Sequence, residues 1–310
     1  MQNPTSQEHT YDVVVIGGGP GGLTAGIYAS RSGLSTLVLE KMAPGGQLLN
    51  TYDVDNVPGF PEGIQGMELA QKLEQQAKRF GTELKMAEIQ EVDLQNQHKL
   101  VKFNDQTIQA RNLIIATGER PKKLGVAGEE TLIGRGVSYC ATCDGAFFKN
   151  QRVAVVGGGD SAIAEAIFLT RLAEKVTVIH RRNQLRAVQY LQNKAFNHEK
   201  IDFKLNTVVN EIRGEKKVES LLLEDTNSGA QKEMDCEGVF IYVGSDPNTG
   251  LLKNTPLEME NGYLLANEEM ETNVPGVYAV GDVRKKTLRQ VVTAMSDGAI
   301  AAFNAEKALM

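Results

Sequence analysis

Three residues near the middle of the chain combine types and a spacing that could carry redox or metal chemistry. Cys140 and Cys143 stand three positions apart in the segment SYCATCDGAFF (138–148), and Asp144 follows directly. Two cysteines at this spacing can hold a zinc ion, close a structural disulfide, or cycle between thiol and disulfide. The local sequence allows all three chemistries, so the elements around it must decide between them.

The composition of the whole chain narrows the function classes. At 310 residues, with 41% hydrophobic and 23% charged residues, the chain suits a globular protein of two domains. The net charge of -6 argues against nucleic acid as the main partner. The N-terminal MQNPTSQEHT lacks the features of a secretory signal, and no apolar run reaches the ~18 residues that span a bilayer. We therefore expect a cytoplasmic protein with neither nucleic acid nor membrane as partner.

The ligand count argues against zinc and against a structural disulfide. A structural zinc site needs four ligands and normally a second pair of cysteines or histidines nearby. The third cysteine, Cys236, stands alone next to an apolar run, and the four histidines (His9, His98, His180, His198) lack metal-site spacing. Three cysteines do not make a disulfide framework, and in a reducing compartment a lone C-x-x-C pair is more often metal-binding or redox-active than structural. We expect no metal, and Cys236 is predicted to be a small buried residue.

An internal repeat supplies the elements that must position this pair. Residues 13–40 (VVVIGGGPGGLTAGIYASRSGLSTLVLE) are echoed by residues 153–180 (VAVVGGGDSAIAEAIFLTRLAEKVTVIH) at a constant offset. Each copy is an apolar β-branched run, a glycine turn, a segment of helical period and a second β-branched run. Both copies are predicted to be β-α-β units.

The first unit has the glycine pattern of a dinucleotide-binding turn. Gly17, Gly19 and Gly22 give G-x-G-x-x-G, which allows a tight turn, close approach of a pyrophosphate and close packing of helix on strand. The unit ends at Glu40, whose carboxylate can accept hydrogen bonds from both ribose hydroxyls and would repel a 2'-phosphate. A bare glycine turn without ligand is the alternative, but the strand before it and the helix after it favour FAD or NAD.

The second unit diverges where a different nucleotide would require it. Gly157 and Gly159 are kept and Ala162 takes the third place, an accepted variant of the pattern. At the position aligned with Glu40 the chain turns basic, with His180, Arg181, Arg182 and Arg186 in HRRNQLR. Guanidinium groups pair bidentately with phosphate, so the segment indicates the 2'-phosphate of NADPH. The alternative is a solvated basic turn.

The remaining strand patterns indicate that the second domain is inserted into the first. LIIATGERP (113–121) and GVYAVGDV (276–283) read as buried strands ending in turns, and both lie outside the second β-α-β unit. Residues 66–81 and 289–309 have helical periodicity, whereas 45–60 is predicted to lack regular structure. We predict an α/β fold of two Rossmann-like three-layer dinucleotide-binding domains. The first spans 1–118 and 248–310, and the second spans 119–247.

The order of these motifs resembles that of the low-molecular-weight thioredoxin reductases over residues 11–309. The series is G-x-G-x-x-G, GGQL, ATG, C-A-T-C-D-G, GGGDSA, HRRxxxR, GD and RQ, and the C-A-T-C-D-G just before GGGDSA is the most specific part. The resemblance implies a homodimeric flavoenzyme that passes electrons from NADPH through FAD to a redox disulfide and on to thioredoxin.

The resemblance also implies the residues of each site. The implied FAD contacts are Gly17, Gly19, Gly22, Glu40, Gly46, Gln47, Thr51, Asn56, Thr117, Gly118, Gly281, Asp282, Arg289, Gln290 and Val291. The implied NADPH contacts are Gly157, Gly159, Asp160, Ser161, Ala162, His180, Arg181, Arg182 and Arg186. Cys140 would face the partner protein, Cys143 would face the flavin, and Asp144 would act as acid or base. Asp144 could instead be only a turn or N-cap residue before Gly145.

Some positions depart from the family pattern. Val57, Ala164, Asn183 and the pair Glu119-Arg120 stand where relatives usually carry other residues. Ala164 and Asn183 border the predicted NADPH site, so the strictness of NADPH over NADH stays open. The three arginines are intact, so the preference itself is expected to hold.

The order of the motifs predicts a domain movement, and several other functions stay open. The C-x-x-C pair and the NADPH site share the inserted domain, yet both must reach one flavin, so we expect the domains to rotate between half-reactions. The rivals are reduction of another small disulfide protein, such as a glutaredoxin-like carrier or a peroxiredoxin-linked module, dithiol oxidation by oxygen, and a flavin-binding redox sensor without turnover. The intact HRRxxxR argues against a purely oxygen-driven enzyme, and a complete second nucleotide site beside the C-x-x-C pair argues against a sensor.

Overall fold

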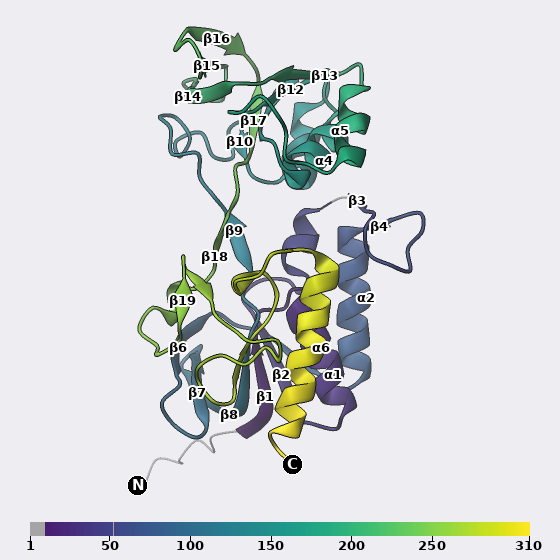
Figure 1. Cartoon of the computed structure of the whole chain (residues 1–310), viewed down its shortest axis with the longest axis vertical. Coiled ribbons are helices and arrows are strands. Elements are labelled where there is room, and N and C mark those ends of the chain that lie inside the picture. The colour runs from purple at the N-terminus through teal and green to yellow at the C-terminus, as the bar shows by residue number, and fades with distance from the viewer. Residues whose placement is uncertain (1–9, 52) are drawn as a thin grey trace. The chain divides into compact units, whose positions relative to one another are not determined.

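The computed structural model describes residues 10–51 and 53–310, and the chain forms two compact units (Figure 1). Unit 1 holds the described residues up to Arg120 together with Pro247–Met310, and unit 2 holds Pro121–Asp246. The strands β9 (Glu119–Pro121) and β18 (Ser245–Pro247), which pair with each other, lie at the two crossings. Residues 1–9 lie outside the described range. They include His9 and the N-terminal segment that is expected to carry no secretory signal.

Unit 1 is built on a mixed sheet with helices along one of its faces. Its remaining elements are β1 (Thr10–Ile16), α1 (Pro20–Arg31), β2 (Thr36–Glu40), η1 (Gly46–Asn50), β3 (Asp53–Val54), β4 (Ile64–Gln65), α2 (Gly66–Arg79), β5 (Glu83–Met86), β6 (Ile89–Asp93), β7 (Lys99–Phe103), β8 (Gln106–Ile115), η3 (Gly250–Leu252), β19 (Met259–Glu260), β20 (Tyr263–Leu264), β21 (Val277–Ala279), η4 (Gly281–Val283) and α6 (Val291–Lys307).

The sheet of unit 1 has the order β5-β2-β1-β8-β7-β6, and β21 pairs with β8. β5, β2, β1, β8 and β21 run parallel, whereas β6 and β7 add an antiparallel hairpin. Strand β8 pairs with β7 along its first half and with β21 along its second half. The carboxyl ends of β1 and β21 therefore lie on either side of the end of β8, which brings three turns far apart in sequence to one edge.

Both faces of the β1 strand are buried, as its continuous apolar run predicts for a parallel strand. Val13 and Val15 face a core with Ala25, Ala301 and other residues of α1 and α6. The opposite face packs against the β6–β7 hairpin and residues from the 251–283 segment. Helices thus cover one face, where Figure 1 shows α1, α2 and α6 side by side, and β structure covers the other.

The helices α1 and α6 cross closely because small residues meet at the crossing. A Cβ on Gly298 would lie 2.2 Å from the Gly21 carbonyl oxygen, and a Cβ on Gly21 would lie 3.0 Å from that of Ala294. Gly21 and Ala294 both belong to the first turns of their helices. The two helix N-termini are therefore neighbours at the edge where β1 and β21 end.

Unit 2 has a five-stranded parallel sheet in the order β10-β17-β11-β12-β13 and a separate antiparallel sheet β14-β15-β16. Its elements are β10 (Val137–Ser138), α3 (Ala141–Asp144), η2 (Gly145–Phe148), β11 (Arg152–Gly157), α4 (Asp160–Leu169), β12 (Lys175–Ile179), α5 (Gln189–Phe196), β13 (Ile201–Lys204), β14 (Thr207–Arg213), β15 (Ser220–Asp225), β16 (Gln231–Asp235) and β17 (Gly238–Tyr242). Helices α4 and α5 cover one face of the parallel sheet and the small sheet covers the other.

The predicted fold class is confirmed, as are both β-α-β units and both long helices. The expectation that residues 45–60 lack regular structure is partly wrong, since η1 and the two-residue strand β3 lie there. Gly45 and Gly46 take φ values of 133° and 55°, which turn the chain into η1. In the part of the chain that the structure describes, the helices are too short or too polar to cross a membrane.

Candidate functional site

The first glycine turn, between β1 and α1, is shaped by the protein's own backbone. Gly17 has a φ of 107°, and a Cβ there would lie 2.3 Å from the Ala116 carbonyl oxygen. A Cβ on Gly22 would lie 1.9 Å from the carbonyl oxygen of Gly17. These two positions need glycine whether or not a ligand binds, because the turn and the helix could not otherwise approach each other.

The middle glycine of each turn is different, because the protein itself leaves room for a side chain there. A Cβ on Gly159 would meet nothing within 4 Å, and one on Gly19 would meet only the Gly46 Cα at 3.9 Å. Their φ values of -95° and -73° suit any residue. Open space beside the first turn of a helix is what a bound pyrophosphate requires, so both turns fit a dinucleotide.

Glu40 lies over the first glycine turn at the end of β2. Its Oε2 accepts a hydrogen bond from the Gly18 backbone N–H at 2.6 Å, and its Oε1 accepts one from Met42 at 3.0 Å. Each oxygen keeps a lone pair for a further donor. The carboxylate is thus fixed where a ribose with free hydroxyls could bind.

The segment after β2 lies against the same turn. The Gly45 N–H donates to the Gly18 carbonyl at 2.7 Å, and a Cβ on Gly46 would lie 3.0 Å from the Gly19 Cα. Gln47 Nε2 donates to the Glu119 carbonyl at 2.9 Å. Thr51 Oγ1 donates to the Gln47 carbonyl at 3.0 Å, and Asn56 Nδ2 donates to Gln290 Oε1 at 2.8 Å.

The end of β8 brings Thr117 and Gly118 to this edge of unit 1. Thr117 exchanges hydrogen bonds with Asn248: its hydroxyl donates to the Asn248 carbonyl at 2.9 Å, and Asn248 Nδ2 donates back at 3.0 Å. The Asn248 N–H donates to the Gly118 carbonyl at 2.9 Å. The two crossings of the chain are therefore tied together at the predicted site.

Glu119 is a site residue whose role the sequence did not reveal. Its carboxylate accepts a hydrogen bond from the Tyr263 hydroxyl at 2.7 Å and pairs with Arg289 Nε at 2.9 Å. The Arg289 guanidinium also lies over the Tyr263 ring, 4.2 Å from its centre. Glu119, which departs from the family pattern, thus holds the side chain of Arg289, a predicted FAD contact.

The turn after β21 places Gly281 and Asp282 at the same edge. Gly281 has a φ of 73°, and Asp282 Oδ1 is buried with no hydrogen-bond partner among the described residues. Burial raises the pKa of Asp282, while Lys286 and Arg289 oppose that rise. Next in the chain, Gln290 closes a capping box at the start of α6, which begins at Val291.

The second glycine turn, between β11 and α4, carries the basic segment. The Gly158 carbonyl accepts from the backbone N–H of Arg186 at 2.6 Å and of Ala187 at 3.0 Å. Asp160 Oδ1 accepts from the Val188 N–H at 2.8 Å. The basic segment is therefore folded directly onto the glycine turn, with exposed Ser161 and buried Ala162 in the first turn of α4.

His180 lies beneath this turn and is buried, with Nε2 lacking a hydrogen-bond partner in the described part of the chain. Burial lowers its pKa, a hydrogen bond to the Gln184 backbone opposes this, and the charges of Arg186, Arg181 and Arg182 lower the pKa further. All three arginines are exposed. No salt bridge joins them to an acidic side chain within the described ranges, so three guanidinium groups are available to an anion.

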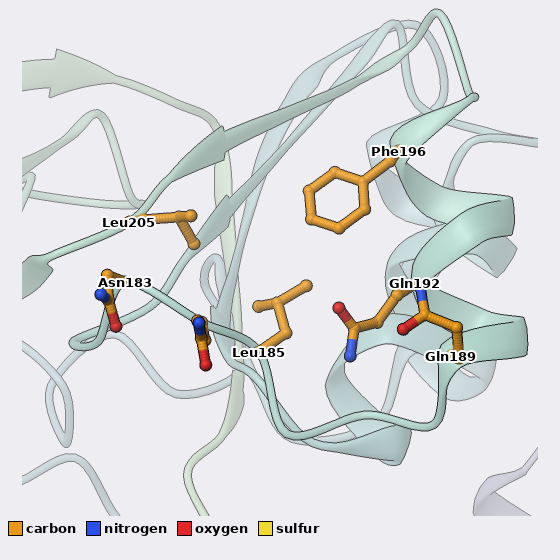
Figure 2. Close-up of a pocket in the computed structure, with 7 residues that line it drawn as sticks. Asn183, Leu185, Gln189, Gln192, Phe196 and Leu205 are labelled. Atoms are coloured by element: carbon orange, nitrogen blue, oxygen red, sulfur yellow. The ribbon is translucent and has the colours of Figure 1, made fainter.

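A pocket of about 380 Å³ lies on the α5 side of the basic segment (Figure 2). Leu185, Phe196 and Leu205 form its apolar part, and Figure 2 shows Gln189 and Gln192 at its rim with Asn183 on the opposite side. Asn183, one of the departures from the family pattern, therefore lines this pocket. Its side chain is exposed, and as a neutral amide it cannot form an ion pair with the arginines.

Cys140 and Cys143 form a disulfide, with Cα atoms 5.4 Å apart. Cys140 is the N-cap of α3, and its Sγ accepts a hydrogen bond from the Cys143 N–H at 3.1 Å. Cys143 is exposed and Cys140 is partly buried. The pair is thus held on a short helical turn with one cysteine more open to solvent than the other.

Asp144 is tied to the disulfide loop through Ser138. The buried Ser138 hydroxyl donates to Asp144 Oδ2 at 2.7 Å and accepts from the Cys140 N–H at 3.0 Å. Asp144 occupies the N-cap position of η2, but its side chain makes no capping hydrogen bond there. Sequence patterns gave no signal for Ser138.

Tyr242, at the end of β17, supports the same loop and was also not predicted. Its hydroxyl accepts a hydrogen bond from the Ala141 N–H at 2.9 Å. Burial raises the pKa of Tyr242, and the Glu165 and Asp144 carboxylates raise it further. The phenol stays protonated and fixes the first residue of α3.

The third cysteine is buried, as predicted. Cys236 is 1% exposed, and burial raises the pKa of its thiol to about 12. A thiol that stays protonated is a poor nucleophile and metal ligand. Among residues 10–51 and 53–310, no three His, Cys, Asp or Glu side chains are grouped to hold a metal ion.

Comparisons with known proteins agree on one group. The model of the family described as pyridine nucleotide-disulphide oxidoreductase matches residues 11–298. The thioredoxin reductase of Listeria innocua is 52% identical over 303 residues, which cover 97% of this chain and 95% of that protein. That of Bacillus subtilis is 51% identical over 298 residues, with coverages of 96% and 94%. The crystal structure of Lactococcus lactis thioredoxin reductase in its FR conformation has a TM-score of 0.94 at 44% identity, covering 96% of this chain and 98% of that one.

Proposed function

The chain belongs to the pyridine nucleotide-disulphide oxidoreductases, within them to the low-molecular-weight thioredoxin reductases, and we propose that it reduces thioredoxin with electrons from NADPH. The observation that carries the proposal is the Cys140–Cys143 disulfide, held in the same compact unit as an arginine-lined glycine turn. The overall reaction consumes NADPH, a proton and a disulfide, and it yields NADP⁺ and two thiols.

Residues 1–118 and 248–310 are the FAD-binding domain in this proposal. Gly19 leaves room for the pyrophosphate, and Glu40 is placed for the adenosine ribose. The buried Asp282 Oδ1, which has no hydrogen-bond partner in the described part of the chain, fits a hydroxyl donor of the cofactor. Held by these residues, FAD would supply a two-electron carrier between NADPH and the disulfide. The other predicted contacts are Gly17, Gly22, Gly46, Gln47, Thr51, Asn56, Thr117, Gly118, Gly281, Arg289, Gln290 and Val291.

Residues 119–247 are the NADPH-binding domain. The exposed Arg181, Arg182 and Arg186 have no acidic partners within the described range, so they are free to clamp a 2'-phosphate. The other predicted contacts are Gly157, Gly159, Asp160, Ser161, Ala162 and His180. Burial keeps His180 neutral, so its ring can donate or accept a hydrogen bond at the nucleotide.

Gly159→Ala tests whether glycine at this position is required for binding of the nucleotide rather than for folding. The new Cβ meets nothing within 4 Å in the protein, and Gly159 is the N-cap of α4, where alanine is less favourable than glycine, so the free energy of unfolding should fall by no more than about 1 kcal/mol. The methyl group would occupy the space proposed for the pyrophosphate, so the Kd for NADPH should rise at least about tenfold. Denaturant unfolding and NADPH titration check the two halves. An unchanged Kd in the folded variant would contradict the proposed placement of the nucleotide.

The thiol chemistry uses the chain's own residues. After reduction, the Cys140 thiolate attacks the disulfide of thioredoxin and forms a mixed disulfide, which releases one thiolate of the partner. Cys143 then attacks Cys140, restores the Cys140–Cys143 disulfide and releases the second thiolate. Asp144, oriented by Ser138, holds or supplies the proton for a leaving thiolate.

The two domains rotate between half-reactions in this proposal, because the disulfide and the NADPH site must use the same flavin in turn. An engineered crosslink between the units should stop turnover, yet leave a single step of flavin reduction by NADPH or by a dithiol. Stopped-flow absorbance of the flavin and steady-state assays measure the two effects. Full turnover in the locked protein would rule out rotation.

Thioredoxin as the partner is supported by the names of the relatives, and a homodimer and a cytoplasmic location complete the proposal. The test mixes the flavin-loaded protein with NADPH or NADH and with thioredoxin, a glutaredoxin-like carrier or oxygen alone, and follows nicotinamide oxidation. Fast oxidation only with NADPH and thioredoxin supports the proposal. Equal rates with oxygen alone would favour a dithiol or flavin oxidase instead.

A further inference from the structure

A group of four charged side chains lies at the turn that carries Asp282; those of Asp297 and Lys286 are buried, whereas those of Arg284 and Asp282 are 16% and 31% exposed. Asp297 on α6 is 4% exposed, and the Lys286 side chain is 7% exposed. With Arg284 and Asp282 they make two positive and two negative charges within unit 1. A buried lysine is costly unless carboxylates compensate it, so this group must have a structural or functional reason.

Asp297 already accepts three hydrogen bonds without Lys286. Its Oδ2 accepts from the Gly281 N–H at 3.0 Å and from Arg284 Nε at 3.0 Å, and its Oδ1 accepts from Arg284 Nη2 at 3.2 Å. Arg284 alone would neutralise its charge. Lys286 Nζ, 3.0 Å from Oδ2, is therefore an additional cation that Asp297 does not require.

Asp282 is the carboxylate that requires the positive charge of Lys286. Lys286 Nζ lies 3.5 Å from Asp282 Oδ1, which is buried and has no hydrogen-bond partner in the described chain. The charged groups that face Asp282 are Lys286 and Arg289, which lower its pKa, and Asp297, which raises it, while burial raises it most. Arg289 is already paired with Glu119. Lys286 is thus the main compensation for a charge on Asp282.

We propose that Lys286 is a positioning residue for the flavin site: anchored by Asp297, it keeps the partly buried Asp282 carboxylate ionised and ready to accept a hydrogen bond from FAD. The inference rests on the proposed function, in which Asp282 contacts FAD. Because an ionised carboxylate accepts hydrogen bonds more strongly than a protonated one, FAD is held less tightly once Asp282 takes up a proton. The pKa of Asp282 then sets the pH at which FAD is lost on acidification.

Lys286→Met tests this, and Lys285→Met is the matched control. Lys285 is the neighbouring residue, is exposed and pairs with Glu260, so the control makes the same chemical change without touching the group of four charged side chains. FAD retained per chain is measured by ultrafiltration across a pH series. Removing an opposite charge at this distance raises a carboxyl pKa by about one unit or more, so the midpoint of FAD loss should move up by about one pH unit in Lys286→Met. Lys285→Met should match the wild type, and Lys286→Arg should restore it.

A background without a titrating group decides whether the effect passes through Asp282. In Asp282→Asn the dependence on pH should largely disappear, and adding Lys286→Met should change FAD retention less than twofold. Unfolding of the apoproteins verifies that each variant folds, and Lys286→Gln replaces Lys286→Met should that variant not fold. An unmoved midpoint in the folded Lys286 variants, an equal shift in Lys285→Met, or a full shift in the Asp282→Asn background would each overturn the inference. A wild-type chain that takes up no FAD would overturn the proposed function as well.

Discussion

Cys143→Ser is expected to lower NADPH-dependent reduction of thioredoxin by at least about 10³-fold, because a serine hydroxyl cannot resolve the mixed disulfide that Cys140 forms. The substitution leaves the nucleotide sites untouched, since the Cys140–Cys143 pair and the two glycine turns use separate residues. NADPH should still reduce the flavin at a rate close to that of the wild type. Steady-state assays measure the first effect and anaerobic stopped-flow absorbance measures the second.

The matched control for this loss is Cys236→Ala, which removes the other cysteine. Cys236 is buried and its thiol stays protonated, so its removal should leave thioredoxin reduction within about twofold of wild type, provided the variant is folded. Equal rates of thioredoxin-dependent NADPH oxidation in Cys143→Ser and wild type would show that the disulfide is incidental. The protein would then be a flavin oxidase and the proposed electron path would be wrong.

Arg182→Ala is expected to raise the KM for NADPH by about 10- to 100-fold while leaving the KM for NADH within about twofold. A charge-assisted hydrogen bond is worth about 1.5–3 kcal/mol, and each 1.4 kcal/mol is tenfold in affinity. Only NADPH carries the 2'-phosphate that the guanidinium would bind, so the preference for NADPH should fall by the same factor. Steady-state kinetics with both nucleotides at saturating thioredoxin measure it.

Arg171→Ala is the control for Arg182→Ala. Arg171 is also exposed and belongs to the same compact unit, but it lies just after α4 and outside the basic segment. Its loss should leave both KM values unchanged. A similar rise for NADPH in both variants would indicate a general effect of net charge, and an equal rise for NADH in Arg182→Ala would contradict the 2'-phosphate clamp.

Periodicity and glycine spacing predicted the elements because short-range rules govern them. The strands, turns and helices of both β-α-β units follow from apolar runs of β-branched residues and from glycines that the backbone demands, such as Gly17. The same rules failed over residues 45–60, where two glycines with positive φ lead into a short helical turn. A run rich in turn residues can still form short elements when its backbone hydrogen bonds are satisfied locally.

The supporting residues could not be predicted, because their partners are distant in sequence. Glu119 meets Tyr263 and Arg289, Ser138 links Cys140 to Asp144, and no local pattern marks either residue. In the sequence alone, Lys286 resembles an ordinary loop residue and Asp297 an ordinary helix residue. Only their burial and their pairing in the structure distinguish them. Sequence patterns identify groups that contact ligands, whereas the groups that hold them depend on the tertiary fold.

The most direct test of the proposed electron path is an anaerobic titration of the FAD-loaded protein that counts the electrons each chain accepts. Wild type should accept four, two on the flavin and two on the Cys140–Cys143 disulfide, and two free thiols should appear per chain. Cys143→Ser should accept only two. A wild-type chain that accepts two electrons and keeps its disulfide intact would contradict the account.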